Sequence, residues 1–209
     1  MALVLNEEQV MLRDSAAGFL GEKASVTQLR ALRDSDDALR FEPAVWREMV
    51  DMGWAGIAIP ENYGGLGYGY TGLGIVLEQM GRHLSAAPLQ SCVLLGATLI
   101  NQLGSEAQKS AWLAAIAGGE KRVSVAIQES AQFAPRHIAL QARRDGEDWV
   151  LSGHKRLVAD AAGADAFLVV ARDSGADTIE ARCSVFVVDA TLDGVEVKHC
   201  DMVDSRQYG

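Results

Sequence analysis

Cysteine and histidine are scarce and scattered in this sequence. The three cysteines, Cys92, Cys183 and Cys200, are odd in number and far apart. They form no disulfide framework and none has the C-x-x-C spacing of a zinc site. No two of the four histidines stand four residues apart, so we expect no metal site. A reducing compartment is the simplest interpretation, and it predicts a cytoplasmic protein.

Long hydrophobic runs and an excess of basic charge are also missing. No segment approaches the roughly 20 apolar residues of a membrane-spanning helix. Residues 1–9 lack the basic and apolar stretches of a signal peptide. The 19 Lys and Arg residues face 28 Asp and Glu, which gives a net charge of −9. Binding to nucleic acids needs clustered positive charge, so we expect neither a nucleic-acid partner nor a membrane span.

The sequence does contain enough apolar residues for a folded core, at 49% of 209 residues. Before residue 120 they recur with a helical period, and capping residues mark the helix starts. We expect helices to begin at or just after Asn6, Pro43, Thr71, Pro88 and Ser105. On the fourth of these, the leucines at positions 95, 99 and 103 stand at a spacing of four.

After residue 120 the apolar period becomes two, which is typical of strands. Strands are predicted within residues 123–127, on both sides of the Asp145-Gly146 turn, and over residues 167–171, 184–188 and 195–199. This order indicates an α+β chain with two unlike modules. We expect an all-α helical domain over residues 1–121 and an antiparallel β-barrel or sandwich domain over residues 122–209.

One glycine string matches a nucleotide-binding pattern. Residues 67–72 read G-Y-G-Y-T-G, in agreement with G-x-G-x-x-G. A dinucleotide site needs a strand before this string and a parallel strand soon after it. Here a loop with Pro60 precedes it and helix follows helix, so a tight glycine loop is the favoured interpretation.

Several motifs occur in an order that is similar to one enzyme family. Residues 54–67 read W-A-G-I-A-I-P-E-N-Y-G-G-L-G, and residues 78–82 read E-Q-M-G-R. Residues 104–113 read G-S-E-A-Q-K-S-A-W-L, residues 125–129 read V-A-I-Q-E, and residues 145–155 read D-G-E-D-W-V-L-S-G-H-K. Together they resemble the signatures of the acyl-CoA dehydrogenase family along essentially the whole chain.

The resemblance implies a fold and a reaction. The family has a helical domain, a middle β-domain and a C-terminal four-helix domain, of which the last is not in this chain. It implies FAD-dependent oxidation of an acyl-CoA, from fatty acids or steroid side chains, to the trans-2-enoyl-CoA. An electron-transfer flavoprotein or similar acceptor and a homo- or heterotetramer are implied as partners. The base lies in the C-terminal domain, so no catalytic residue is assigned here. The chain is a fragment, the ordered part of a longer protein or a truncated relative.

The resemblance also implies binding residues, which fall in two segments of the β-domain and on one helix. The cofactor-binding residues are Ile127, Gln128, Glu129, Ala134, Leu157, Val158 and Ala159. The substrate-binding residues are Leu95, Thr98, Leu99 and Ala134. For the three helical residues, packing in the bundle core is the alternative interpretation. For Glu129, a structural hydrogen-bonding role is favoured over a chemical one.

The chain departs from the family pattern at the expected flavin site. Gln128 stands where Thr is usual, and Ala134 and Pro135 stand where Ser and Asp are usual. Leu157 replaces an aromatic residue that covers the isoalloxazine, and Ala159 replaces a Thr whose hydroxyl reaches the N5/O4 edge. One lost hydrogen bond costs about 0.5–1.5 kcal/mol. Three functions therefore stay open: a flavoenzyme, a degenerate non-catalytic partner subunit, and an acyl-CoA-binding module without redox activity.

Overall fold

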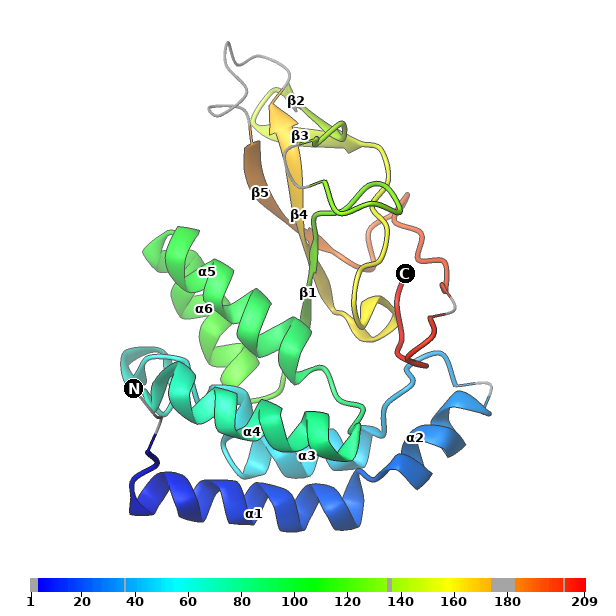
Figure 1. The fold of residues 1–209 in the computed structure, drawn as a ribbon. Helices are drawn as coiled ribbons and strands as arrows, with labels where there is room; N and C mark the ends of the chain where they lie inside the picture. The colour runs from blue at the N-terminus through cyan, green and yellow to red at the C-terminus, as the bar shows by residue number, and fades with distance from the viewer. Residues whose placement is uncertain (1–3, 36, 135–136, 174–182, 201) are drawn as a thin grey trace.

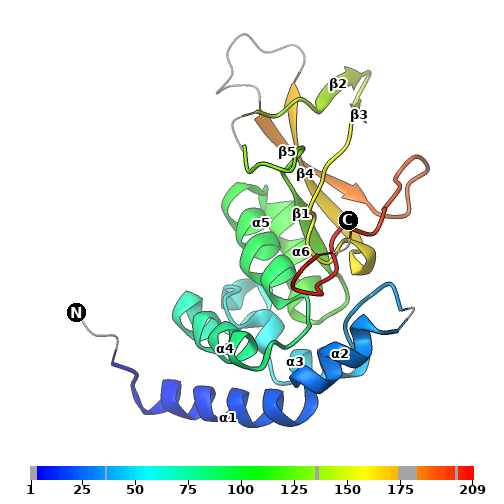
Figure 2. The same ribbon diagram turned by 45° about the vertical axis from the view of Figure 1, so that its right-hand side comes forward.

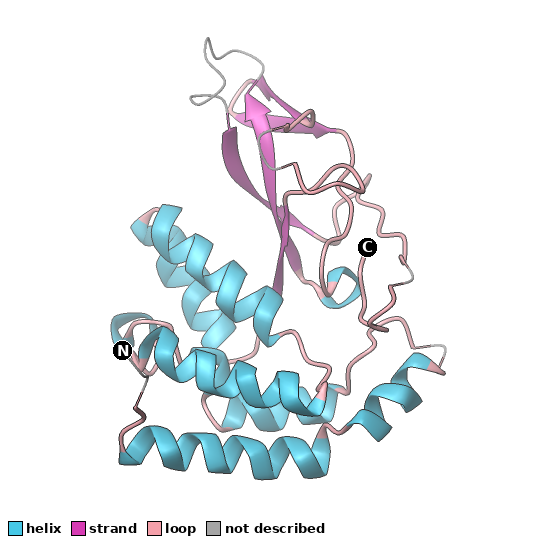
Figure 3. Ribbon diagram, viewed as in Figure 1, coloured by secondary structure: helices cyan, strands magenta, loops and turns pink. Residues whose placement is uncertain are grey.

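A computed structural model of the chain describes residues 4–35, 37–134, 137–173, 183–200 and 202–209. Helices fill the N-terminal half and strands the C-terminal half (Figures 1 and 3). The α-helices are α1 (Glu7–Lys23), α2 (Val26–Arg33), α3 (Pro43–Asp51), α4 (Gly69–His83), α5 (Thr98–Leu103) and α6 (Glu106–Ala117). A π-helix, η3 (Leu89–Ala97), precedes α5, and the short 3₁₀ helices are η1 (Trp54–Gly56), η2 (Glu61–Tyr63) and η4 (Ala161–Gly163). The strands are β1 (Val123–Ala126), β2 (Gln141–Asp145), β3 (Asp148–Ser152), β4 (Ala166–Asp173) and β5 (Cys183–Asp189).

Capping residues fix the starts of two predicted helices, α1 and α6. Asn6 Oδ1 accepts a hydrogen bond from the Gln9 N–H at 2.8 Å, and the Gln9 side chain accepts one from the Asn6 N–H at 3.0 Å. Ser105 and Gln108 form the same reciprocal box at the start of α6. Each box satisfies two backbone donors that a helix end would otherwise leave without partners.

The eight-residue helix α2 was not predicted from the sequence. It buries only Leu29 and Leu32, too few residues for a clear periodic signal. Its C-terminal carbonyl groups are satisfied from outside, because the Arg40 guanidinium donates to the carbonyls of Leu32 and Arg33. The helix therefore depends on a residue beyond its own end.

The helix expected after Pro88 forms, as η3 followed by α5, but two of its three leucines at a spacing of four, Leu95 and Leu103, lie outside the core. The buried residues of η3 include the small residues Ser91, Gly96 and Ala97. The helix packs on β1 so closely that a Cβ added to Gly96 would lie 2.3 Å from Val123 Cγ2. Leu95 and Leu103, on the opposite side, are 46% and 65% exposed. Close backbone approach through small residues decided the packing side, rather than the leucine spacing.

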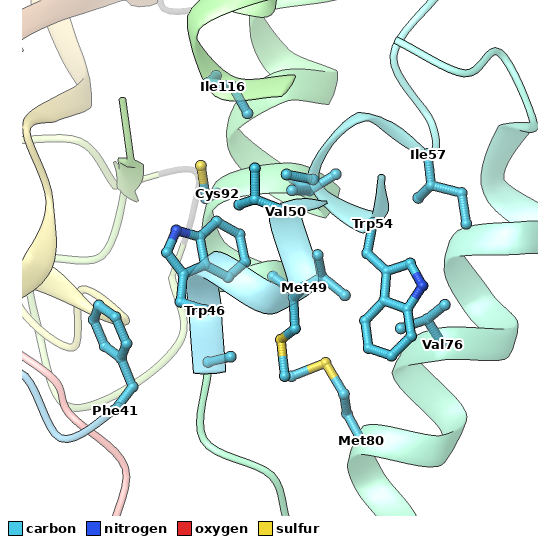
Figure 4. Close-up of a cluster of buried hydrophobic side chains, with 14 of the residues drawn as sticks. Phe41, Trp46, Met49, Val50, Trp54, Ile57, Val76, Met80, Cys92 and Ile116 are labelled. Carbon is cyan, nitrogen blue, oxygen red and sulfur yellow. The ribbon is translucent and has the colours of Figure 1, made fainter. Parts of the chain in front are cut away.

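The main hydrophobic core joins the helices to one face of the sheet. Figure 4 shows Met49 and Met80 pointing toward each other between the indole rings of Trp46 and Trp54. All four side chains are at most 5% exposed. Methionine fills such irregular gaps well, so this contact packs α3 against α4.

The sheet is mixed, which corrects the prediction of antiparallel strands throughout. β4 is central and pairs in parallel with both β1 and β2, and antiparallel with β5. Only β2 and β3 form the predicted hairpin across Asp145 and Gly146. Turn signals in a sequence fix the direction of strands joined by a short turn, but β1 and β2, the parallel partners of β4, are distant from it in the chain.

Alternation along β4 separates two cores. Ala166 and Leu168 join the helical core, while Phe167, Val169 and Ala171 join a second cluster on the other face. The strand predicted over residues 195–199 does not form; Cys200 instead makes an isolated bridge to Tyr208. The C-terminal segment runs beside η4 in both views (Figures 1 and 2). The division of the chain between residues 121 and 122 stays a prediction.

Candidate functional site

The glycine string of residues 67–72 is only partly the loop that the sequence favoured, because α4 already begins at Gly69. The loop that leads into α4 consists of residues 64–68. Gly64 and Gly67 have positive φ angles of 82° and 60°. A Cβ on Gly65 would lie 2.0 Å from the carbonyl oxygen of Ile59, so the backbone passes there with no space for a side chain. The Tyr63 hydroxyl then donates to Glu106 at 2.6 Å, which attaches the loop to α6.

The two segments aligned with flavin-binding motifs lie side by side after β1 and after β3. The Arg156 N–H donates to the carbonyl of Gln128 at 2.7 Å. The Lys155 ammonium donates to the carbonyl of Ile127 at 3.1 Å. Residues 127–128 and 155–156 are far apart in the sequence. They are therefore joined by one bond between main chains and by one bond from a lysine side chain to a main-chain carbonyl.

Glu129 holds this arrangement together. Its carboxylate lies 2.6 Å from Lys155 Nζ and accepts backbone N–H groups from Ala139 at 2.6 Å and Leu140 at 3.0 Å. The two charged side chains are only 12% and 6% exposed. Burial alone raises the pKa of Glu129. The hydrogen bonds together lower the pKa by more than burial raises it, so the pKa lies below the ordinary value. These contacts agree with the structural hydrogen-bonding role favoured from the sequence, and the assignment of Glu129 to the cofactor stays a prediction.

Residues 158–160 pair with the C-terminal segment. Val158 and Gly209 exchange two hydrogen bonds, at 2.9 and 3.0 Å, and the Asp160 N–H donates to Gln207 at 2.9 Å. Ala159 stands opposite Tyr208 in this antiparallel bridge. In such a pair, the N–H and C=O groups of the middle residue point away from the partner strand. The Ala159 N–H is thus directed outward, and it has no hydrogen-bond acceptor within the described ranges.

Two non-glycine residues with positive φ angles flank this donor. Leu157 has φ 55° and Asp160 has φ 54°. A leucine in the left-handed region is uncommon and costs about 1–2 kcal/mol. Such strained residues cluster where a ligand is held, because the surrounding structure fixes them there. The backbone between them is therefore held in one orientation.

The remaining cofactor candidates are spread over the loop after β1. The Gln128 amide donates to the carbonyl of Ser130 at 2.8 Å, so at least one of its donors serves the loop itself. Ala134 is half-buried and its carbonyl accepts the His137 N–H at 2.9 Å. Pro135 lies outside the described residues. The assignment of Gln128 and Ala134 to a ligand stays a prediction.

The three helical substrate candidates differ in their surroundings. Thr98 lines a small pocket with Ala58, Pro60 and Tyr70, and its Oγ1 lies 3.0 Å from the Tyr70 hydroxyl. Leu99 packs against the helical core, and Leu95 is exposed. These three residues stay predicted substrate contacts.

Sequence reasoning missed Ser91 and Arg206, which attach this region to the helices. The Ser91 hydroxyl donates to the Asp160 carboxylate at 2.5 Å, and Arg206 donates to the carbonyl of Ser85. Both contacts join residues far apart in the chain, so no local pattern in the sequence signals them. Among the described residues, no cluster of possible metal ligands occurs, and no helix is long and apolar enough to cross a membrane.

Comparison with known proteins identifies the chain. Residues 6–120 match the family model "Acyl-CoA dehydrogenase, N-terminal domain", and residues 130–206 match "Acyl-CoA dehydrogenase, middle domain". The chain belongs to the acyl-CoA dehydrogenase family. Its α+β fold of helices followed by a sheet agrees with these two domains, and no C-terminal domain of the family is matched.

Individual acyl-CoA dehydrogenases are similar to this chain over about half of their own length. The acyl-CoA dehydrogenase FadE12 of Mycobacterium tuberculosis is 31% identical over 203 residues, which are 96% of this chain and 51% of FadE12. The structure of the Tcur3481-Tcur3483 steroid ACAD G363A variant has a TM-score of 0.85 at 30% identity, and covers 97% of this chain and 54% of the other. The ChsE4-ChsE5 complex from Mycobacterium tuberculosis has a TM-score of 0.85 at 26% identity, and covers 100% and 54%.

Proposed function

We propose that this chain is the first half of an FAD-dependent acyl-CoA dehydrogenase that oxidises an acyl-CoA thioester to the trans-2-enoyl-CoA. The observation that carries the proposal is the outward-directed Ala159 N–H, on a segment joined to residues 127–129. A donor of this kind fits the N5/O4 edge of a flavin, which accepts hydrogen bonds. The domains are proposed as residues 1–121 and 122–209.

The main chain fits the flavin better than the side chains do. Ile127, Gln128, Glu129, Leu157 and Val158 are proposed to line the flavin edge, with Ala159 as donor. Bound FAD supplies the acceptor for the hydride that leaves the β-carbon of the substrate. The buried Lys155–Glu129 pair holds residues 127–129 and 155–159 in a fixed relative position, and water is excluded from the space around the pair. Ala134, Leu95, Thr98 and Leu99 are proposed to contact the acyl-CoA.

The visible spectrum of the purified full-length product tests this proposal. We expect a flavin spectrum that is bleached anaerobically by an acyl-CoA, with both fatty acyl and steroid side-chain thioesters tried. The proposed enzyme is a cytoplasmic homo- or heterotetramer. It passes its electrons to an electron-transfer flavoprotein or a similar acceptor. A flavin that no acyl-CoA bleaches contradicts the proposed reaction.

A non-catalytic partner subunit is the second candidate, and a specific observation favours it. Leu157 and Ala159 lack the aromatic ring and the hydroxyl expected at the flavin, and the Gln128 amide is engaged with Ser130. Two of the similar solved structures are named as pairs of chains, Tcur3481-Tcur3483 and ChsE4-ChsE5. This candidate predicts a colourless protein alone and activity only after co-expression with a homologous subunit. Stoichiometric FAD in the isolated protein would count against it.

A further inference from the structure

A side-chain contact joins the π-helix to the residue that follows the outward donor. Ser91 on η3 donates its hydroxyl hydrogen to Asp160 Oδ2 at 2.5 Å. Ser91 is 2% exposed, so its hydroxyl has no access to bulk water. A hydrogen bond from a buried hydroxyl to a carboxylate is stronger than a bond between neutral groups. It connects the helical half of the chain directly to the turn at residue 160.

The same turn is held at its backbone. The Asp160 N–H donates to the Gln207 carbonyl, and the Asp160 carbonyl accepts the Ser124 hydroxyl at 3.4 Å. Arg206, next to Gln207, donates to the carbonyl of Ser85, the residue that follows α4 and its cap. The strand pair of residues 158–160 and 207–209 is thus fastened to the helical half at two points. Burial raises the pKa of Asp160, while Ser91 and the charge of Arg206 lower it, and the net pKa is above the ordinary value.

The backbone geometry makes the carboxylate contact important. Residue 160 has φ 54°, a conformation that aspartate tolerates better than most residues but that still needs support. Rotation of this residue toward an ordinary φ would turn the preceding peptide units. The Ala159 N–H lies one residue before this turn and would change direction with it.

We propose that Asp160 is a positioning residue: its carboxylate, held by Ser91, keeps the turn at residue 160 in place and so directs the Ala159 N–H toward the flavin N5/O4 edge. This inference rests on the proposed flavin site. It assigns Ser91 and Asp160 a role in ligand geometry, without contact between either side chain and the substrate.

The test compares Ser91→Ala with a matched variant, Ser85→Ala, in the full-length protein. Ser85 is also buried, and its hydroxyl donates to the carbonyl of Ala24 at 2.7 Å. Its contact with Arg206 uses the main chain, which alanine retains.

The Ser91 hydroxyl also lies 3.2 Å from the carbonyl of Pro88, within its own helix start, so the long-range contact that Ser91→Ala removes is the one to Asp160. We expect Ser91→Ala to weaken FAD binding at least tenfold and to shift the visible absorption and circular dichroism of the bound flavin. Both variants are expected to lower Tm by similar amounts, but Ser85→Ala should change neither the FAD affinity nor the flavin spectra.

Two Asp160 variants keep the test decisive if Ser91→Ala does not fold. Asp160→Asn retains an oxygen acceptor for Ser91 and should retain FAD affinity within about threefold of wild type, whereas Asp160→Ala should lose at least tenfold. Equal FAD affinity and an unchanged flavin spectrum in Ser91→Ala or Asp160→Ala overturn the positioning role alone. A wild-type protein that binds no FAD, alone or with a homologous subunit, overturns the proposed function as well.

Discussion

Glu129 and Lys155 form a buried ion pair of 2.6 Å that joins the end of β1 to the segment after β3. Both partners make further hydrogen bonds, Glu129 to two backbone N–H groups and Lys155 to the carbonyl of Ile127. A buried pair with its remaining hydrogen-bonding groups satisfied gives a fixed geometry. This pair therefore sets the distance between the two segments of the candidate flavin site.

Removing one partner of this pair should be costly. We expect Lys155→Met to lower the free energy of unfolding by about 3 kcal/mol, because Glu129 would be left buried without its counter-charge. Urea unfolding followed by circular dichroism measures the change. Arg143→Ala is the matched control, since Arg143 pairs with Asp145 at 3.6 Å with both side chains more than 60% exposed. A cost below about 1 kcal/mol, the range of exposed pairs, would contradict the structural role.

The same pair predicts a dependence of stability on pH. The folded-state pKa of Glu129 lies below its ordinary value of 4.5. The contribution of such a group is fully present above that ordinary value and is lost as the pH falls through the lower folded-state pKa. We expect Glu129→Gln to be destabilising at neutral pH and to flatten the acid side of the stability profile. Unfolding free energies from pH 3 to pH 7 test this. Parallel profiles for variant and wild type would show that Glu129 does not contribute to the pH dependence of stability.

The close contact between η3 and β1 predicts opposite effects of two glycine substitutions. Gly96→Ala would place a methyl group 2.3 Å from Val123 Cγ2. We expect a loss of about 1–3 kcal/mol, typical of overpacking. Gly74→Ala on α4 has no neighbour within 4 Å and should stabilise the protein by up to about 1 kcal/mol. Thermal unfolding of both variants measures the difference, and equal Tm values would show that η3 does not depend on Gly96.

Two of the cysteines, Cys92 and Cys183, should differ in reactivity. Burial raises the pKa of Cys92 to about 12, whereas Cys183 is exposed. At pH 8, only about one Cys92 thiol in ten thousand is then a thiolate, the form that reacts. We expect iodoacetamide to modify Cys183 in the native protein and Cys92 only after unfolding. Peptide mass spectrometry measures both; rapid native modification of Cys92 would contradict its burial between η3 and β1.

The sequence predicted the helix starts well, because capping is local. Asn6 with Gln9, and Ser105 with Gln108, form the boxes that their spacing indicates. The prediction failed where distant contacts decide. Leu95 and Leu103 are exposed, because the opposite side of the helix, with Gly96, packs on β1.

Strand direction and the supports of the candidate site could not be predicted for the same reason. β4 pairs with strands that no short turn connects to it. The family resemblance brought residues 127–129 and 157–159 to attention, but the bond from Ser91 to Asp160 spans 69 residues of sequence. Local patterns carry no information on such contacts.

FAD titration of the full-length protein tests most directly whether the backbone at Ala159 binds a flavin edge. The dissociation constant is to be measured for wild type, Ala159→Thr and Ala159→Pro, with any required homologous subunit present. Restoring the hydroxyl in Ala159→Thr should tighten FAD binding by up to about tenfold. Removing the N–H in Ala159→Pro should weaken FAD binding by about tenfold or more. Residues 158 and 160 keep their pairing to residues 207–209 in this variant. Equal dissociation constants for the three proteins, or no binding by any of them, would contradict the account.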